Sequence, residues 1–379
     1  MALMHDVIVI GGGIVGTSAA YHLVCAGAKT LLIDRHDAGR ATDAGAGILS
    51  AETYSGDCEP WFQLALQAAA YYPDLVDRIA PFADGDVGYG TCPKLTVAAA
   101  DEEVPGFERA KRKVLERQGR GGRPPSTELY EMSAEEVQRR FPFLAETKGA
   151  LYFASSARVD GRRLTQAMLQ AALARGLSVK EAGVDELVLR DKHVSGVKVG
   201  DDVIDAPNVV IAGGAWSSSF EPQLGVKIPV EPQRGLLVHL RVFEGDTSGW
   251  PIIEAFRGHY IVPWPDGRVV AGATRETGAG FDAIPTVDGL REVLDEAFRL
   301  VPELAGAEIV EMRVGLRPLC LDRLPLLGTV PHLRGVFLAT GHGSTGLQLG
   351  PYSGKLVAAL ILGEPTPTDL RPFEVTRFI

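Results

Sequence analysis

The sequence of 379 residues has few of the features that mark disulfide-rich or metal-binding proteins. Its four cysteines, Cys25, Cys58, Cys92 and Cys320, lie far apart and form no C-x-x-C pair. The eight histidines show neither H-x-x-x-H nor H-E-x-x-H spacing. Widely separated thiols of this kind are typical of a reduced cytosolic protein, so we predict no disulfide and no metal site, and we expect the protein in the cytoplasm.

Long apolar runs and basic clusters are also lacking. No run reaches the roughly 18 apolar residues of a membrane-spanning helix. Asp6 would interrupt the apolar part of a signal peptide, so no targeting segment is expected. Because 38 Lys and Arg stand against 48 Asp and Glu, the net charge is −10, and no basic stripe indicates a nucleic acid partner.

What the sequence does have is a dinucleotide-binding pattern near its N-terminus. Residues 6–16 read D-V-I-V-I-G-G-G-I-V-G, an apolar strand followed by G-x-G-x-x-G. Gly11 permits a tight turn, Gly13 leaves space for a pyrophosphate, and Gly16 lets the next helix pack closely on the strand. That helix is predicted at residues 14–26, and its free N–H groups and positive dipole end would face the phosphates.

A second apolar strand is predicted at residues 30–35, and it contains an acid at the position where dinucleotide-binding folds contact a ribose. Asp34 lies about 20 residues beyond the glycines, where dinucleotide-binding folds place a carboxylate on the ribose hydroxyls. An acid there disfavours a 2′-phosphate, but the motif alone leaves FAD and NAD both open. A lone glycine motif could be an ordinary turn in a chain with 44 glycines, so the prediction depends on strand, loop, helix, strand and acid occurring in order.

The order of predicted elements indicates an α/β fold in an α+β, two-domain arrangement. A Rossmann-like nucleotide domain is expected at residues 1–92, 147–230 and 315–379. A mostly antiparallel β-sheet domain for the substrate is interleaved with it, at residues 93–146 and 231–314. Predicted strands of the first domain include 178–182, 197–203, 209–212 and 335–339, and those of the second include 235–242, 259–263 and 268–273.

An amphipathic stretch at residues 61–79 is predicted to be helical. It could lie peripherally on a membrane or contact a partner subunit, but a helix packed within its own domain is the favoured interpretation. The sequence leaves open whether the chain forms a homo-oligomer.

Further motifs follow along nearly the whole chain. They read A-T-D-A-G-A-G-I-L at 41–49, V-V-I-A-G-G-A-W-S at 209–217, P-V-E-P-Q-R-G at 229–235, Y-I-V-P-W-P-D-G-R-V-V-A-G-A-T at 260–274, G-L-R-P at 315–318 and A-T-G-H-G-S-T-G at 339–346. In this order, the chain resembles the D-amino-acid oxidase superfamily of flavoproteins, and most of all its glycine oxidase and D-amino-acid dehydrogenase branch.

The resemblance implies non-covalent FAD as the cofactor. Cys320 lies a few residues beyond the position at which monomeric sarcosine oxidases attach the flavin. Glycines 341, 343 and 346 precede a helix whose N-terminus could stabilise negative charge on the reduced flavin. The residues expected to bind FAD are Gly11, Gly13, Ile14, Val15, Gly16, Asp34, Arg35, Arg40, Ala41, Thr42, Ala46, Gly47, Ile48, Val184, Gly213, His342, Gly343, Ser344, Thr345, Gly346, Leu347 and Gln348.

The resemblance also places Arg317 on the substrate carboxylate and the hydroxyl of Tyr260 toward the substrate. Arginine suits that role because its planar fork binds a carboxylate bidentately and stays charged. From sequence alone, Arg317 could equally form a structural ion pair and Tyr260 could be a core aromatic. Ser344 and Trp264 stand where relatives have arginines, so we expect one carboxylate clamp and a roomier, less polar pocket.

The expected function is oxidation of the C–N bond of a small amino acid, either a D-amino acid or an N-alkyl amino acid such as sarcosine, or glycine. Hydride transfer to the flavin would give an imine that hydrolyses to a keto acid and an amine, without a side-chain base. One alternative is a 2-hydroxy-acid dehydrogenase that uses His342 as its base. Another is a non-catalytic flavin-binding subunit of a larger oxidase.

Overall fold

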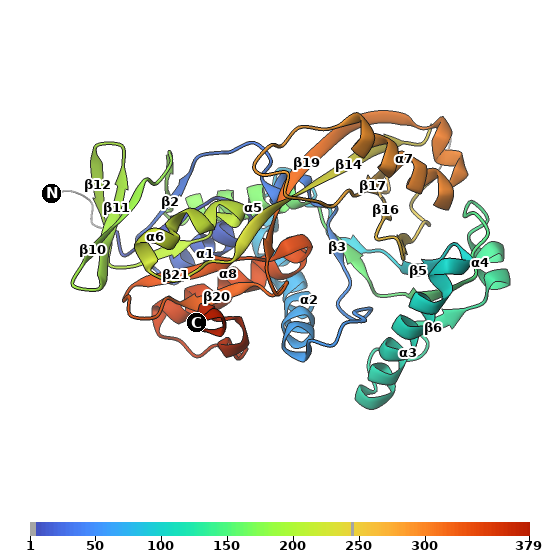
Figure 1. Ribbon diagram of the computed structural model, residues 1–379, viewed down its shortest axis with the longest axis horizontal. Coiled ribbons are helices and arrows are strands. Elements are labelled where there is room, and N and C mark those ends of the chain that lie inside the picture. Colours follow the sequence, from blue (N-terminus) through green and yellow to red (C-terminus); the bar gives the residue numbers. More distant parts are fainter. Residues whose placement is uncertain (1–4, 244–245) are drawn as a thin grey trace.

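The computed structural model describes residues 5–243 and 246–379, which form two large sheets that lie side by side (Figure 1). The first sheet has the strand order β20-β21-β13-β1-β2-β9 and is parallel except for β20. Its strands are β1 (Val7–Ile10), β2 (Thr30–Asp34), β9 (Ser178–Glu181), β13 (Val209–Ile211), β20 (Leu326–Thr329) and β21 (Val336–Thr340). The doubly wound sheet predicted for the nucleotide domain is therefore present.

The central strand β1 is buried on both faces, as expected from its continuous apolar run. Val7 and Val9 pack into a core with the helices α1 (Ile14–Cys25), α2 (Glu59–Ile79), α5 (Gly161–Leu173) and α8 (Gly346–Leu362). Ile8 and Ile10 face the opposite core, which includes residues of α6 (Glu221–Leu224) and of a three-stranded meander. The sheet therefore has a layer on each side.

The meander consists of β10 (Glu186–Arg190), β11 (His193–Val199) and β12 (Asp202–Asp205). The single strand predicted at residues 197–203 is therefore wrong. The chain reverses at Gly200, where φ is 60° and the backbone N–H donates to Asp185 (2.7 Å). Glycine adopts this left-handed conformation without a Cβ penalty, which permits the tight turn between two short strands.

The second sheet is mostly antiparallel, as predicted, and has the order β18-β14-β17-β16-β15-β5-β7-β6, with β19 pairing along β14. Only β5 and β15 run parallel. Its strands are β5 (Lys94–Ala98), β6 (Leu129–Met132), β7 (Gly149–Phe153), β14 (Val230–Arg241), β15 (Ile252–Ala255), β16 (Tyr260–Pro263), β17 (Arg268–Gly272), β18 (Glu276–Thr277) and β19 (Glu308–Cys320). The mixed two-domain fold class predicted from sequence is confirmed.

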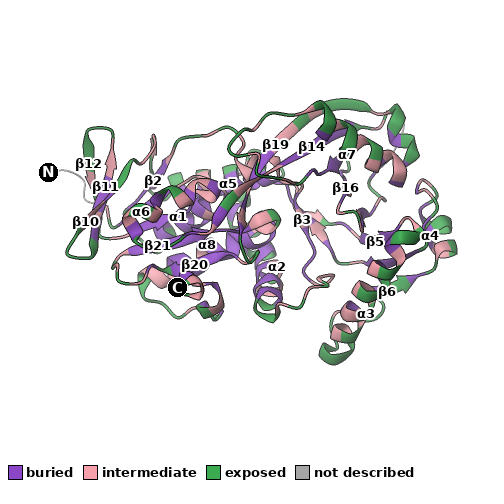
Figure 2. Ribbon diagram, in the orientation of Figure 1, coloured by how far each residue is buried: buried purple, intermediate pink, exposed green. Residues whose placement is uncertain are grey.

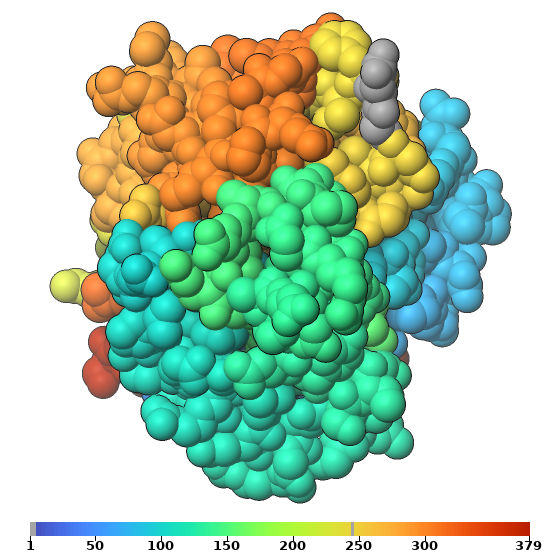
Figure 3. Space-filling model, turned by 90° about the vertical axis from the view of Figure 1, so that its right-hand side faces the viewer, coloured from blue at the N-terminus to red at the C-terminus, as the bar shows by residue number. Residues whose placement is uncertain are grey.

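Three helices accompany this sheet. Val293 and Ala297 of α7 (Val287–Leu300) pack against Leu236 and Val238 of β14. The helices α3 (Val104–Gly121) and α4 (Ala134–Arg140) lie at the far end of the molecule, where they form the lower part of the surface in Figure 3, with α7 above them. Figure 2 shows few buried residues along α3, whereas α8 is largely buried and α2 has one buried face.

Some strands do not fit the predicted domain division. The strand β7 belongs to the second sheet, because it pairs with both β5 and β6, although residues from 147 onward were assigned to the nucleotide domain. The strand β19 runs through the predicted boundary at residue 315. The division into domains remains a prediction, and its boundaries near residues 147 and 315 do not coincide with the edges of the two sheets.

The antiparallel ribbon of β14 and β19 joins the two sheets. Val230 and Cys320 at one end of the ribbon lie in the core of the first sheet, whereas Leu236 and Val238 lie in the core of the second. The residues between these ends, including Gly235 and its register partner Gly315, therefore lie where the two sheets meet.

The predicted amphipathic helix at residues 61–79 corresponds to α2. Its Trp61, Phe62 and Leu64 are buried in the core that α2 shares with α1 and α8, so the apolar face is covered within the chain. In the described parts of the chain, no helix combines the length and apolar character that crossing a bilayer requires.

The remaining short strands, β3 (Ile48–Leu49), β4 (Gly90–Thr91) and β8 (Ala157–Arg158), form a small sheet between the two large ones.

Candidate functional site

One continuous cavity runs from the edge of the first sheet to the second sheet. It encloses about 1670 Å³ of empty space, including its open mouth. Asp34, Arg35 and Val184 line one end, and Tyr260 and Arg317 line the other. Gly11, which directly follows the parallel strand β1, and Gly213, two residues after the parallel strand β13, line the middle. This is the point where the strand order reverses, at which open α/β sheets bind their ligands.

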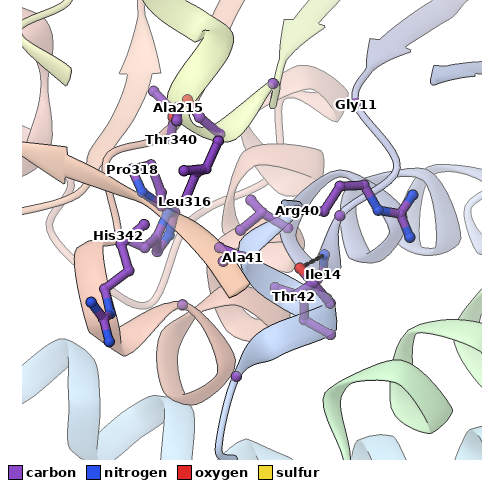
Figure 4. A pocket seen from close by; sticks show the side chains of 18 of the residues that line it. Gly11, Ile14, Arg40, Ala41, Thr42, Ala215, Leu316, Pro318, Thr340 and His342 are labelled. Carbon is purple, nitrogen blue, oxygen red and sulfur yellow. Dashed lines mark hydrogen bonds between the residues drawn. The ribbon is translucent and has the colours of Figure 1, made fainter. Parts of the chain in front are cut away.

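Two helix N-termini open on the cavity. The backbone N–H of Ile14 in α1 donates to Oγ1 of Thr42 (3.0 Å), as Figure 4 shows. Helix α8 begins at Gly346 after a short 3-10 turn, and neither helix has a side-chain cap of its own. Because uncapped N-termini concentrate free N–H groups and positive dipole, the cavity favours an anionic ligand.

Close packing of α1 and α8 explains how both helix starts reach one cavity. A Cβ on Gly354 of α8 would lie 2.6 Å from the backbone nitrogen of Ala19, and one on Gly350 would lie 2.9 Å from Ile14. Only glycine allows the two backbones to approach this closely. In Figure 4, Ile14, Ala41 and Thr42 lie on one side of the cavity, and Leu316, Pro318 and His342 lie on the other.

At the first end of the cavity, Asp34 is already held in place. Its Oδ2 accepts from Nη1 of Arg40 (2.6 Å) and lies 3.3 Å from Nδ1 of His36. Arg35 instead pairs with Asp37 on the surface. Arg40 therefore orients the carboxylate that the sequence predicts to bind a ribose.

At the opposite end, Arg317 projects from β19 beside Tyr260. Nη1 of Arg317 donates to the carbonyl of Thr274 (2.9 Å), and none of the described acids forms an ion pair with it. Burial lowers the pKa of the Arg317 guanidinium, and Tyr260 opposes that shift. Burial raises the pKa of Tyr260, although the charge of Arg317 acts to lower it. The phenol is therefore neutral near pH 7. A half-buried cation without a counterion is a strong site for a carboxylate.

Two glycines make room for these side chains. A Cβ on Gly235 of β14 would lie 2.5 Å from Cζ of Arg317, and a Cβ on Gly272 of β17 would lie 2.9 Å from the hydroxyl of Tyr260. Real Cβ contacts are essentially never this short. The P-V-E-P-Q-R-G motif therefore ends in glycine because the guanidinium of Arg317 lies directly over it.

His342 lines the cavity, but its ring is engaged inside the protein. Nε2 lies 3.0 Å from Oγ of Ser353, and the residue is only 3% exposed. Burial lowers the pKa of His342 to about 4. The ring is therefore neutral at neutral pH and is a weak proton acceptor there.

The structure brings nearly all predicted site residues to the cavity, and two lie outside it. A Cβ on Gly16 would collide with the carbonyl oxygen of Gly11, so this glycine serves helix packing. Oγ1 of Thr345 donates to the carbonyl of His342 (2.8 Å) and stabilises the turn before α8. The predicted residues that line the cavity are Gly11, Gly13, Ile14, Val15, Asp34, Arg35, Arg40, Ala41, Thr42, Ala46, Gly47, Ile48, Val184, Gly213, Tyr260, Arg317, His342, Gly343, Ser344, Gly346, Leu347 and Gln348.

The main residue that the sequence reasoning missed is Arg275. It lines the same end of the cavity as Arg317, so a second cation lies beside the one carboxylate clamp that was predicted. Trp264 does not line the cavity and is buried in a small apolar cluster with Val262 and Val270. Cζ of Arg268 lies over its ring, 4.6 Å from the centroid. The available signal was position, because Arg275 directly follows the motif at 260–274.

Comparison with known proteins places this geometry among flavoenzymes. The profile of the "FAD dependent oxidoreductase" (DAO) family matches residues 6–360. A glycine oxidase of Pseudomonas putida is 31% identical, with 98% of each chain covered. An iminodiacetate oxidase structure from Chelativorans sp. BNC1 is 34% identical, with a TM-score of 0.89 over 97% of this chain and 98% of the other. A glycine oxidase structure from Geobacillus kaustophilus is 29% identical, with a TM-score of 0.90 and 99% of each chain covered.

Proposed function

The chain belongs to the DAO family of FAD-dependent oxidoreductases, and on this premise we propose that it oxidises the C–N bond of a small amino acid. Its relatives named glycine oxidase and iminodiacetate oxidase act on substrates of this type, which supports the reaction class. We propose a D-amino acid or an N-alkyl amino acid as the substrate, with an imine product that hydrolyses to a keto acid and an amine.

The residues of the cavity fit FAD. Nε2 of Gln348 is buried at the cavity without a hydrogen-bond partner, whereas its Oε1 accepts from the backbone of Ser50 (3.3 Å). A ligand acceptor at this place would satisfy that amide. Gly214 adopts a φ of 54°, and a Cβ there would meet no atom within 4 Å, so the backbone is open toward the cavity. We propose that the glycine loop and Thr42 hold the pyrophosphate and that Asp34 holds the ribose.

Bound FAD supplies a hydride acceptor, and the chain supplies the positioning. Cys320 is fully buried in the core of the first sheet rather than at the cavity, and burial raises the pKa of its thiol to about 11. The thiol is therefore protonated at neutral pH and a poor nucleophile, which supports a non-covalent cofactor.

The observation that carries the proposal is the unpaired guanidinium of Arg317 in the same cavity as the two helix N-termini. Arg317 would bind the substrate carboxylate, and the neutral phenol of Tyr260 would donate to it. A carboxylate fixed at two points orients the α-carbon, and such orientation provides much of the rate acceleration when no proton transfer is needed.

The lack of a suitable base favours an amine over an alcohol as the reacting group. Among the described residues that line the cavity, the carboxylates Asp34 and Asp37 lie at its opposite end, and His342 is the only imidazole. A neutral amine needs no base, because its own lone pair assists loss of the hydride. A hydroxy acid would need one, and the low pKa of His342 makes it poorly suited.

The test is anaerobic mixing of the FAD-loaded protein with a panel of D-amino acids, N-methylglycine, iminodiacetate and 2-hydroxy acids. We expect amines to bleach the flavin absorbance and Arg317→Gln to raise the concentration that is needed. Repeating the experiment with oxygen distinguishes an oxidase from a dehydrogenase. The proposal is refuted if only the hydroxy acids bleach the flavin, or if no compound of the panel does.

A further inference from the structure

A second guanidinium lies at the substrate end of the cavity. Arg275 follows β17 and is adjacent to Thr274, whose carbonyl accepts the hydrogen bond from Arg317. Nη1 of Arg275 donates to the carbonyl of Gly258 (2.5 Å). Gly258 has a φ of 87°, and a Cβ there would lie 2.6 Å from the Arg275 nitrogen, so the turn before β16 is shaped around this arginine.

Two acids near Arg275 are already paired with other cations. Glu254 forms an ion pair with Lys94, and that pairing, more than burial, holds the pKa of Glu254 low. Glu276 pairs with Arg234 (2.5 Å). The charge of Arg275 acts on Glu254 as well, but no described acid forms an ion pair with Arg275. The substrate end of the cavity therefore holds two guanidinium groups without an ion-pair partner of their own among the described residues.

These two charges act on each other and on the same phenol. Burial lowers the pKa of Arg317 most, and the charge of Arg275 lowers it further. Burial also raises the pKa of Tyr260, and the positive charges of both arginines partly counteract that rise. Two neighbouring cations repel each other, and this repulsion is relieved when an anion binds between or beside them. One carboxylate would neutralise only one of the two charges.

We propose that Arg275 binds a second carboxylate, so that the substrate is an N-carboxyalkyl amino acid in which two carboxylates flank a secondary amine. This inference rests on the proposed function and specifies its substrate class. Arg317, half-buried, holds the carboxylate next to the carbon that is oxidised. Arg275, exposed at the cavity mouth, holds the distal carboxylate. Ser344 lines the cavity without adding a third cation, so the charges of site and substrate balance.

The test uses two non-oxidisable ligands that differ only in the distal carboxylate, thiodiacetate and (methylthio)acetate. Their dissociation constants are measured on the FAD-loaded protein from the change in flavin absorbance. We expect thiodiacetate to bind at least about tenfold more tightly, because a charge-assisted hydrogen bond contributes that much. Arg275→Gln should remove the preference, and Arg275→Lys should keep part of it. Arg317→Gln should weaken both ligands.

Arg291→Gln is the matched control, because it removes an exposed arginine of α7 that is remote from the cavity lining. It should leave both dissociation constants unchanged. Equal binding of the two ligands, or a preference that survives Arg275→Gln, would overturn the inference while bleaching by N-methylglycine still supported the proposed function. If no amine bleaches the flavin and neither ligand binds, both proposals fail.

Discussion

Replacing Gly235 with alanine should damage substrate binding without damaging the fold. The new Cβ would lie 2.5 Å from Cζ of Arg317, so the guanidinium must move away from its present place. The backbone of Gly235 is not in the left-handed region, so alanine can adopt it. A glycine-to-alanine change at a compatible position stabilises a protein by about 0.4–1 kcal/mol, which offsets the local adjustment.

The size of the binding defect follows from the hydrogen bonds that Arg317 would lose. A hydrogen bond to a charged group contributes about 1.5–3 kcal/mol, and about 1.4 kcal/mol corresponds to a factor of ten. Displacement of the guanidinium should therefore raise the dissociation constant of an amino acid substrate by roughly 10- to 100-fold. The thermal midpoint should stay within a few degrees of the parent protein.

The assay is anaerobic flavin reduction as a function of substrate concentration, with thermal unfolding of the same samples. Gly90→Ala is the matched control, because Gly90 also lies in a strand and a Cβ there would meet no atom within 4 Å. Unchanged substrate affinity in Gly235→Ala would refute the role given to Arg317. A large loss of stability would refute the claim that only the side chain moves.

Three further predictions concern the cofactor and the effect of pH. Gln348→Met removes the unpartnered buried amide and should weaken FAD about fivefold in equilibrium titrations, since one hydrogen bond contributes about 1 kcal/mol. Unchanged affinity would contradict the assigned contact. Asp34→Asn removes the carboxylate that Arg40 orients and should weaken FAD by about 10-fold or more, with little effect on the substrate concentration for half-maximal reduction once FAD is saturating. Burial lowers the pKa of His239 to about 4 from 6.5, so the unfolded chain binds more protons between these values and stability falls as the pH drops through that window. His239→Gln should therefore lose less stability than the parent between pH 7 and pH 5 in urea unfolding, and equal losses would contradict this.

The cofactor half of the site could be predicted from sequence because its chemistry depends on backbone and on local order. Gly11 and Gly13 are required by turn geometry and close approach, and Asp34 follows them at a distance set by one helix and one strand. These constraints act within about 30 residues, so they appear in the sequence as a motif of fixed spacing. The parallel strands β1 and β2 were predicted for the same reason, and β13 was predicted from its own short apolar run.

The errors have two different causes. A local turn signal was overlooked at residues 197–203, because Gly200-Asp201 is a dipeptide typical of two-residue hairpin turns and the chain does reverse there. Gly16 and Thr345 belong to binding motifs, yet their own atoms serve packing and a turn. A motif identifies the loop, whereas the three-dimensional contacts decide which of its residues face the ligand.

Arg275 shows why specificity was the hardest feature to predict. The arginine lies one residue beyond the motif at 260–274 and three residues beyond the end of β17, and that position is the only sequence signal that separates it from a solvated surface residue. Its position depends on the β14–β19 ribbon, which brings Arg317 from over 40 residues away to the carbonyl of Thr274. Cofactor binding is therefore encoded in short segments of the chain. The charge that would select one substrate arises from strand pairing, so a sequence departure such as Ser344 can only be interpreted after the strands have been placed.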